Sequence, residues 1–183
     1  MKVMTLDIDG VLNNYPKCWL DFIELKTGKA FNSLKEAKEH LGEKDYRLIK
    51  FDYRTSGYKK ELPVNPLAKE FTQNLKSNGY TIVVSTSRPF KDFPKLESLT
   101  EEWLRLNQIQ FDYLESKNEA LLEKHPSIQF HVDDELDHAL FFLRKNIDVY
   151  IVKRSDIDYG NVEMFPTLKF VADLNEVLYH ISN

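Results

Sequence analysis

Two aspartates lie two residues apart near the start of the chain, directly after a short apolar run. Residues 2–6 read as a buried strand, and Asp7, Asp9 and Gly10 follow it. A bend at Gly10 lets the chain approach a ligand closely, so the two carboxylates can converge on one point. Close carboxylates repel one another and are costly unless a cation holds them. Although Asp-Gly is also common in solvated turns, this context favours a functional site.

A second acidic pair, Asp133 and Asp134, follows the apolar run at residues 128–132. One of the two could simply cap a following helix. Mg²⁺, however, takes oxygen ligands and usually keeps several waters, and the second pair supplies the missing half of such a site. We therefore expect Mg²⁺ as the cofactor, with Asp7, Asp9, Asp133 and Asp134 as candidate ligands.

Further candidates are hydroxyl and basic residues after apolar runs. Thr86 and Ser87 follow the run at 80–85, where hydroxyls and free backbone N–H groups can bind phosphate oxygens. Arg88 could contact a phosphate or pair with a carboxylate. Lys117 alone would be read as a solvated charge, and gains meaning only from the other motifs.

The elements that must position these residues alternate between strands and helices. Strands are expected at 2–6, 80–85, 128–132 and 148–152. Helical spacing follows at 66–78, at 136–143, at 174–181 and after a capping box formed by Ser98 and Glu101. This alternation predicts an α/β fold with a central parallel sheet, in which ligands bind outside the carboxyl ends of the strands.

Residues 13–63 are far longer than one crossover connection requires. They carry short helical patterns at 17–26, 33–40 and 45–51 and many aromatic residues. We expect a mostly helical cap insertion over the strand ends, which shapes the substrate pocket and excludes water. The predicted organisation is a core domain of residues 1–12 and 64–183 and a cap of residues 13–63.

Composition limits the class of protein. The 183 residues carry a net charge of −4, which argues against broad non-specific binding to nucleic acid or membranes. A single cysteine, Cys18, excludes an intrachain disulfide and a cysteine-based metal site. Asp7 and Asp9 interrupt any N-terminal apolar segment, and no stretch is long enough to span a membrane. We expect a soluble, cytoplasmic protein.

Taken in order, the motifs at Asp7–Leu12, Thr86, Lys117 and Asp133–Asp134 resemble the four motifs of the haloacid dehalogenase superfamily, over about residues 2–153. The resemblance implies a Rossmann-like three-layer sandwich, Mg²⁺ and an aspartyl-phosphate intermediate. The second acid, at Asp9, is the feature that separates phosphatases from dehalogenases in that superfamily. The resemblance therefore predicts a phosphomonoester hydrolase acting on a small-molecule phosphate ester.

The same resemblance assigns a role to each matching residue. Asp7 looks like the nucleophile, and Asp9 like the general acid and then base, with its backbone carbonyl on Mg²⁺. Thr86, Ser87 and Lys117 resemble the groups that hold the phosphoryl oxygens, and Asp133 and Asp134 the acidic metal pair.

Residues 53–58, Leu62-Pro63 and Trp103 resemble segments of the cytosolic 5′(3′)-deoxyribonucleotidases. That resemblance implies a nucleoside monophosphate substrate. Tyr53 and Tyr58 could then stack on a base or belong to the core of the insertion. Trp19 and Phe22 lie on a helical pattern, which favours the core for both.

Other functions remain open. Residues 86–89 with Thr100 and Trp103 also resemble the 3′-phosphatase domain of phage polynucleotide kinase, which would make nucleic acid the partner. That function needs an open basic channel, which the insertion could line with Lys35, Lys38, Lys44, Arg47, Lys50, Lys59 and Lys60. Interspersed glutamates favour a solvated face instead. A phosphatase of another small ester, a phosphotransferase and a non-catalytic binding protein are further alternatives. None of the five histidines is assigned a catalytic role, and His131 is interpreted as a core residue.

Overall fold

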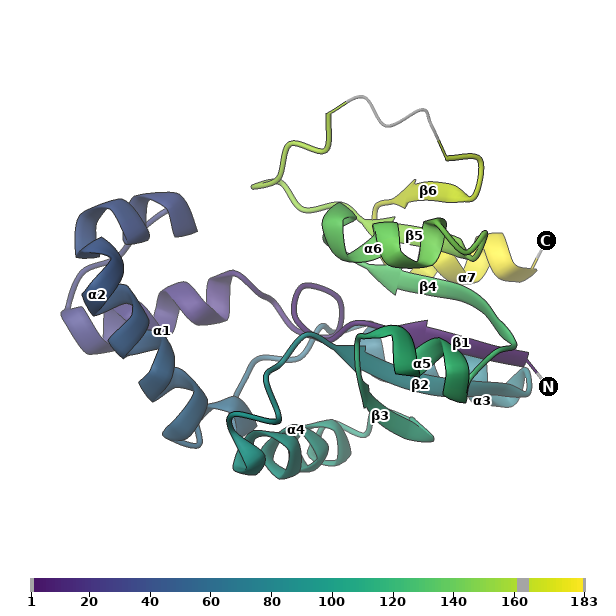
Figure 1. Ribbon diagram of the computed structural model, residues 1–183, viewed down its shortest axis with the longest axis horizontal. Coiled ribbons are helices and arrows are strands. Elements are labelled where there is room, and N and C mark those ends of the chain that lie inside the picture. Colours follow the sequence, from purple (N-terminus) through teal and green to yellow (C-terminus); the bar gives the residue numbers. More distant parts are fainter. Residues whose placement is uncertain (1, 161–164, 183) are drawn as a thin grey trace.

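A parallel sheet forms the centre of the molecule (Figure 1). The structure is a computed structural model, and it describes residues 2–160 and 165–182. In this part of the chain the sheet has six strands in the order β3-β2-β1-β4-β5-β6. They are β1 Lys2–Leu6, β2 Tyr80–Thr86, β3 Tyr113–Ser116, β4 Ile128–Asp133, β5 Asp148–Val152 and β6 Leu168–Val171. The predicted α/β, Rossmann-like fold with a central parallel sheet is confirmed.

Helices cover both faces of the sheet. Alternate residues of each strand point to opposite faces, so Met4 and Leu6 of β1 pack in one apolar layer and Val3 in the other. The first layer also contains buried residues of α3 (Ala68–Ser77), α4 (Pro94–Leu106) and α7 (Leu174–Ser182). The second layer contains those of α5 (Glu119–Lys124) and α6 (Leu136–Leu143). Burial on both faces explains why the central strands are almost continuously apolar.

The insertion folds as helices at one end of the sheet, on the left of Figure 1. It contains α1 (Lys17–Thr27), α2 (Leu34–Thr55) and the short 3₁₀ helix η1 (Tyr58–Lys60). Gly42, with φ 71° and ψ 164°, interrupts α2, so the two helical patterns expected at 33–40 and 45–51 lie on either side of a kink. Trp19 and Phe22 are buried, as expected for core residues. The boundaries of the core domain and the cap stay a prediction, and residues 1, 161–164 and 183 lie outside the described residues.

The two connections between the sheet and the insertion lie side by side. Asn13 and Val64 form an isolated antiparallel bridge, and the Asn65 N–H donates to the Leu12 carbonyl at 2.8 Å. The Trp103 indole of α4 donates to the Leu62 carbonyl at 2.8 Å. These contacts fix where the insertion begins and ends relative to the strand ends.

Several sequence-based expectations need correction. Strands β3 and β6 were not anticipated, because each has four residues, forms a sheet edge and is only partly buried. Ser98 is not an N-cap: α4 begins at Pro94, a residue suited to a first helical turn, and the Ser98 hydroxyl donates to the Lys95 carbonyl inside the helix. Helix α5 was also missed, since six residues give little periodicity.

The strand order and register bring the candidate residues together at the carboxyl ends of the strands. Leu6 is in register with Val84 of β2 and Val132 of β4, so the residues that follow these three strands are neighbours. The Asp7 N–H donates to the Val132 carbonyl at 2.9 Å, and the Lys117 N–H donates to the Thr86 carbonyl at 2.9 Å. Among the described residues, no helix has both the length and the apolar character to cross a lipid bilayer.

Candidate active site

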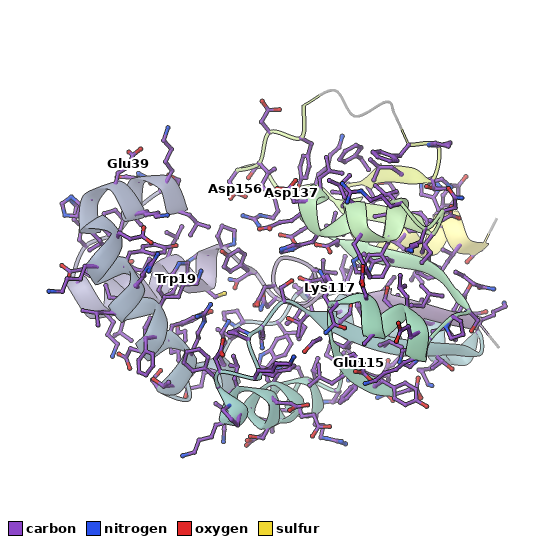
Figure 2. The ribbon with its side chains drawn as sticks, viewed as in Figure 1. Trp19, Glu39, Glu115, Lys117, Asp137 and Asp156 are labelled. Carbon is purple, nitrogen blue, oxygen red and sulfur yellow. The ribbon has the colours of Figure 1, made fainter. Side chains whose placement is uncertain are left out.

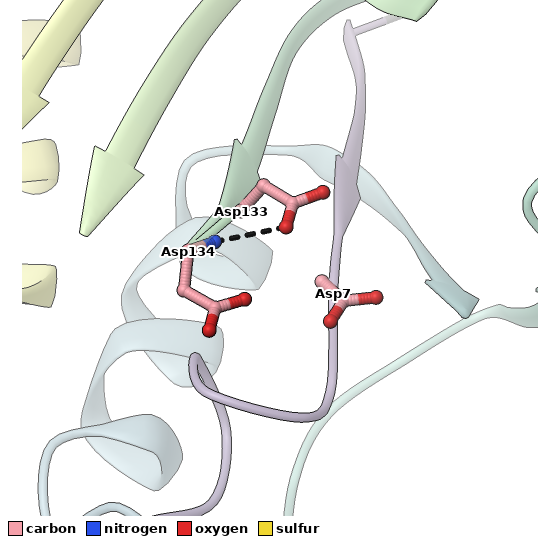
Figure 3. Close-up of side chains that lie close together, drawn as sticks. All are labelled: Asp7, Asp133 and Asp134. Atoms are coloured by element: carbon pink, nitrogen blue, oxygen red, sulfur yellow. Dashed lines mark hydrogen bonds between the residues drawn. The ribbon is translucent and has the colours of Figure 1, made fainter. Parts of the chain in front are cut away.

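Three carboxylates meet where β1 and β4 end. Asp7, Asp133 and Asp134 are buried, and one oxygen from each lies within 4.8 Å of the others (Figure 3). Asp7 comes from the end of β1 and the pair from the end of β4, as the sequence predicted. The Cα of Gly10 faces Asp134 with φ +92°, and a side chain at this position would overlap the Asp134 carboxylate. The first motif therefore needs glycine because the second acidic pair approaches so closely.

The electrostatics of this cluster favour a bound cation. Burial raises the pKa of Asp7 to about 7, against the opposing charge of Lys117. Burial and the charges of Asp7 and Asp133 raise the pKa of Asp134 to about 8. Both pKa shifts arise first from burial and second from repulsion between the carboxylates, and a divalent cation would oppose both effects. The donor set is made of carboxylate oxygens, so these residues fit Mg²⁺.

Asp133 is held by four hydrogen bonds. Its Oδ1 accepts from the backbone N–H groups of Asp134 and Glu135 at 2.9 and 3.1 Å. Its Oδ2 lies 2.6 Å from Lys117 Nζ and 2.8 Å from His131 Nε2. Burial alone would raise the pKa of Asp133, but Lys117 and His131 hold it below its usual range. Asp133 is therefore a fixed, ionised carboxylate.

His131 is buried as expected, and it also orients Asp133. Its Nδ1 lies 2.8 Å from the Thr5 hydroxyl, and burial lowers its pKa to about 4. A neutral imidazole that donates from Nε2 to Asp133 accepts at Nδ1 from Thr5. This positioning role was missed, because one histidine inside a strand pattern gives no sign of its partners.

Lys117 lies between the two acidic motifs. Its buried Nζ is 2.9 Å from Asp7 Oδ1 and 2.6 Å from Asp133 Oδ2. Burial alone would lower the pKa of Lys117, but the two carboxylates raise it, so the ammonium stays charged. The residue that looked weakest in the sequence thus contacts the candidate nucleophile directly.

Asp9 lies in a different set of contacts. Arg88 donates to both of its carboxylate oxygens, at 3.0 and 2.7 Å, and Asn13 donates at 2.7 Å. Burial alone would raise the pKa of Asp9, but the charges of Arg88 and Lys59 hold it well below its usual range. The carboxylate is therefore ionised and lies outside the group of Asp7, Asp133 and Asp134. A metal contact through its backbone carbonyl stays a prediction.

Arg88 and Thr86 are buried, and Ser87 is exposed. Of the two partners considered for Arg88, the structure shows a carboxylate, Asp9, and the guanidinium also donates to Thr100 at 2.9 Å. The Thr86 hydroxyl accepts from the Arg88 N–H at 3.3 Å. All three residues line the same cavity.

Lys59 is a site residue that the sequence placed only among possible channel cations. Its Nζ is buried, lies 3.7 Å from Asp9 Oδ1 and stands 4.1 Å from the centre of the Tyr53 ring. Burial and the charge of Arg88 lower its pKa to about 7, although Asp9 acts in the other direction. Lysine is almost never fully buried, so the sequence carried no signal for this position.

Arg154 was also missed. It follows β5, and its guanidinium donates to Asp134 Oδ2 at 2.6 Å and to Asp156 at 2.9 Å. The guanidinium lies 5.3 Å from the centre of the Tyr15 ring. The sequence offered one indication of this role, namely that Arg154 follows a predicted strand whose carboxyl end lies beside the acidic motifs. The recognised motifs ended at residue 153, so Arg154 was not considered.

A cavity of about 260 Å³ joins the strand ends to the insertion. From the strand ends it is lined by Asp7, Asp9, Thr86, Ser87, Arg88 and Asp134, and from the insertion by Tyr15, Trp19, Lys50, Tyr53, Arg54 and Lys59. Figure 2 shows Trp19 in the insertion and Lys117 at the edge of the sheet. The insertion thus contributes walls to this cavity, and its action as a lid stays a prediction.

The aromatic residues of the insertion differ in position. Tyr53 lines the cavity but is buried against Trp19 and Phe22, with ring centres 4.8 and 5.0 Å apart. Tyr58 is not among the lining residues and packs on Phe22 at 4.8 Å. Burial favours a core role for Tyr53, and Tyr58 is a partly buried residue that packs against the same core.

Most of the proposed channel cations are paired with carboxylates. Lys35 pairs with Glu39, Lys60 with Glu102, and both Lys38 and Arg47 with Glu43. The pairs of Lys35, Lys38 and Arg47 lie along the solvated face of α2, and the pair of Lys60 joins η1 to α4. Lys50 and Lys59 instead line the cavity.

The sequence matches no protein-family model and no curated protein. The fold does match solved structures. One, from Clostridium acetobutylicum and described as a predicted phosphatase, has a TM-score of 0.71 at 15% identity, over 99% of this chain and 98% of that chain. The D,D-heptose 1,7-bisphosphate phosphatase of Burkholderia thailandensis has a TM-score of 0.64 at 14% identity, over 100% of each chain. A haloacid dehalogenase-like hydrolase of Streptococcus pneumoniae has a TM-score of 0.63 at 14% identity, over 99% and 98%. At these identities the likeness shows a shared fold.

Gly10→Ala tests the close approach of the two acidic motifs. Gly79→Ala is a matched control, because its φ is +78° and an added Cβ meets nothing within 4 Å. Both variants should lose about 1–2 kcal/mol of unfolding free energy from the left-handed backbone. Gly10→Ala should lose clearly more in thermal denaturation, because it also displaces Asp134. Equal losses in the two variants would show that the approach at Gly10 is unimportant.

Lys59→Met tests the buried lysine. With a pKa lowered to about 7, Lys59 destabilises the fold most below pH 7, and this cost falls as pH rises towards the unfolded value of 10.5. Methionine retains the apolar stem, and Arg88 still neutralises Asp9. We expect a higher unfolding midpoint at pH 6, a smaller gain at pH 9, and reduced turnover. Lys60→Met, which alters the neighbouring lysine paired with Glu102, is the control. A midpoint lower than that of the wild type at pH 6 would refute this account of Lys59.

Proposed function

We propose that the chain is a Mg²⁺-dependent phosphomonoester hydrolase that works through a phosphorylated Asp7. The observation that carries this proposal is the buried Asp7 carboxylate, which lies beside Asp133, Asp134 and Lys117 and lines a cavity. Asp7, Asp133 and Asp134 would hold Mg²⁺, which when bound supplies charge neutralisation for the phosphoryl oxygens. The fold shared with a heptose bisphosphate phosphatase is consistent with this chemistry.

In the first half-reaction, an Asp7 oxygen attacks phosphorus while the bond to the leaving oxygen breaks. This transfer depends mainly on alignment and charge neutralisation. Lys117 Nζ lies 2.9 Å from the attacking carboxylate, so its ammonium is placed to neutralise charge on the oxygens of the phosphoryl group during transfer. The Thr86 hydroxyl accepts from the Arg88 N–H, which leaves its own hydrogen free for a phosphoryl oxygen.

Asp9 would transfer the proton in both half-reactions, first as an acid and then as a base. The leaving oxygen needs a proton, whereas Asp9 is ionised by its contacts with Arg88 and Lys59. A bound phosphate dianion competes for these cations and adds a negative charge nearby, and both effects raise the pKa of Asp9. Asp9 then takes up a proton from solvent as the substrate binds and donates it to the leaving oxygen. After the leaving group departs, the Asp9 carboxylate takes a proton from water. That water attacks phosphorus, releases phosphate and restores Asp7.

The cavity favours a small substrate. At about 260 Å³ it lies just below the usual range of about 300–1,000 Å³ for ligand pockets. A nucleoside monophosphate is the finer proposal, supported by the resemblance of residues 53–58 to deoxyribonucleotidases and by the partly exposed ring of Tyr15 in the lining. Another small phosphate ester fits the same reacting groups.

Asp7→Asn tests the nucleophile. The wild type incubated with Mg²⁺ and a ³²P-labelled ester, then quenched in acid, should carry a base-labile label on Asp7. Asp7→Asn should carry none and should lose phosphate release to background, with a normal circular dichroism spectrum. Asp21→Asn, an exposed aspartate paired with Lys17, is the control for removing one carboxylate. Full phosphate release by a folded Asp7→Asn protein would reject the mechanism.

A further inference from the structure

Two cations of the insertion face the cavity from helix α2. Lys50 and Arg54 lie four residues apart, so they occupy the same side of the helix one turn from each other. Both line the cavity that contains Asp7, Asp9 and Thr86. The cavity thus has two cations from α2 in addition to Lys59 and Arg88, which lie beside Asp9.

Neither cation has a carboxylate partner among the described residues, whereas neighbouring basic residues of the same helix do. Lys38 and Arg47 pair with Glu43, at 3.2 and 2.6 Å. Arg54 instead places its guanidinium 5.3 Å from the centre of the Phe93 ring, and Lys50 Nζ lies 6.0 Å from the centre of the Tyr46 ring. Burial, together with the charges of Arg54 and Lys38, lowers the pKa of Lys50. The charges of Asp9 and Glu135 act on Lys50 in the opposite direction, but neither Lys50 nor Arg54 forms a salt bridge with a carboxylate of the described residues. An anion bound directly between the two cations would therefore reduce their mutual repulsion.

A second hollow of about 410 Å³ adjoins this point and shares Lys50 and Arg54 with the cavity. Its other lining residues include Tyr46, Phe51 and Phe93. The carboxylate in its wall, Glu43, is already neutralised by Lys38 and Arg47. A group that extends from the cavity past Lys50 and Arg54 therefore meets aromatic surface and no free negative charge from Glu43.

We propose that Lys50 and Arg54 form an anion subsite for a second acidic group, a phosphate or a carboxylate, on the leaving group of the substrate. This inference rests on the proposed function, which places the reacting phosphate beside Asp7 and Lys117. The leaving group then points away from the strand ends, towards the insertion. The planar guanidinium of Arg54 matches the two oxygens of either acid, and Lys50 adds a point charge.

The surroundings favour a small phosphate ester with one additional acidic group over a nucleic-acid strand. A strand needs several phosphates neutralised along a basic track. Lys35, Lys38, Arg47 and Lys60 are instead paired with glutamates, and the chain carries a net charge of −4. Two cavity-lining cations that form no salt bridge within residues 2–160 and 165–182 suit a single additional acidic group.

The test uses substrates that differ in one group. 3-Phosphoglycerate carries a carboxylate where glycerol 3-phosphate carries an alcohol, and a nucleoside 3′,5′-bisphosphate differs from its 5′-monophosphate by one phosphate. The wild type should show a higher kcat/KM for the more acidic member of at least one pair. Lys50→Gln and Arg54→Gln should each reduce that preference about tenfold, the loss expected for one charge-assisted contact. Lys44→Gln, which removes an exposed cation of α2 outside both hollows, should leave the preference unchanged.

Binding separates this inference from the proposed function. The Asp7→Asn variant is titrated with the same ligands by calorimetry. Tighter binding of the more acidic member of a pair, lost in the double variant Asp7→Asn/Arg54→Gln, supports the subsite even if no ester is hydrolysed. Hydrolysis without any preference, or a preference that survives both substitutions, overturns the subsite and leaves the proposed function intact. Preferred hydrolysis of a 3′-phosphorylated oligonucleotide over all the small esters also overturns it, in favour of a polyanion track.

Discussion

The structure depends on the meeting of three buried carboxylates at the end of two adjacent parallel strands. The register between β1 and β4 brings Asp7 next to Asp133 and Asp134, and Gly10 removes the side chain that would keep them apart. Such a cluster is unfavourable by itself, since burial and mutual repulsion raise the pKa of Asp7 and Asp134. Lys117 and Arg154 offset part of that repulsion from either side. The carboxylate oxygens that remain form a donor set that fits a divalent cation.

The insertion completes the site by adding positive charge on the opposite side. Lys59 reaches Asp9 from η1, and Lys50 and Arg54 line the same cavity from α2. The two acidic centres therefore differ. Asp7 lies among carboxylates with a raised pKa, whereas Asp9 lies among cations with a lowered one. This separation suits a nucleophile bound next to a metal and a neighbouring acid–base group that responds to the charge of the substrate.

The sequence predicted the features that depend on local pattern, namely the central strands and the acidic motifs at their ends. It did not predict the residues whose roles depend on tertiary contacts. The four central strands were recognised because burial on both faces makes them largely apolar. The acidic motifs were recognised because they lie at the ends of two of those strands. The edge strands β3 and β6 are short and half-exposed, so their pattern is weak. The Ser98 capping box was overruled by Pro94, which starts the helix one turn earlier. Lys59 and Arg154 could not be identified from local sequence, because their roles depend on tertiary contacts. Lys59 of η1 contacts Asp9, and Arg154, which follows β5, contacts Asp134.

Thermal unfolding with and without Mg²⁺ tests the central claim most directly. A cation that binds only the folded protein adds about 2.7 kcal/mol at a concentration of 100 times its Kd, which for a chain of this size raises the midpoint by roughly 5–10 °C. We expect such a rise for the wild type on passing from a chelator to excess Mg²⁺, and its loss in Asp134→Asn. Equal midpoints for the wild type under both conditions, or an undiminished rise in Asp134→Asn, would contradict a metal site built from these three carboxylates.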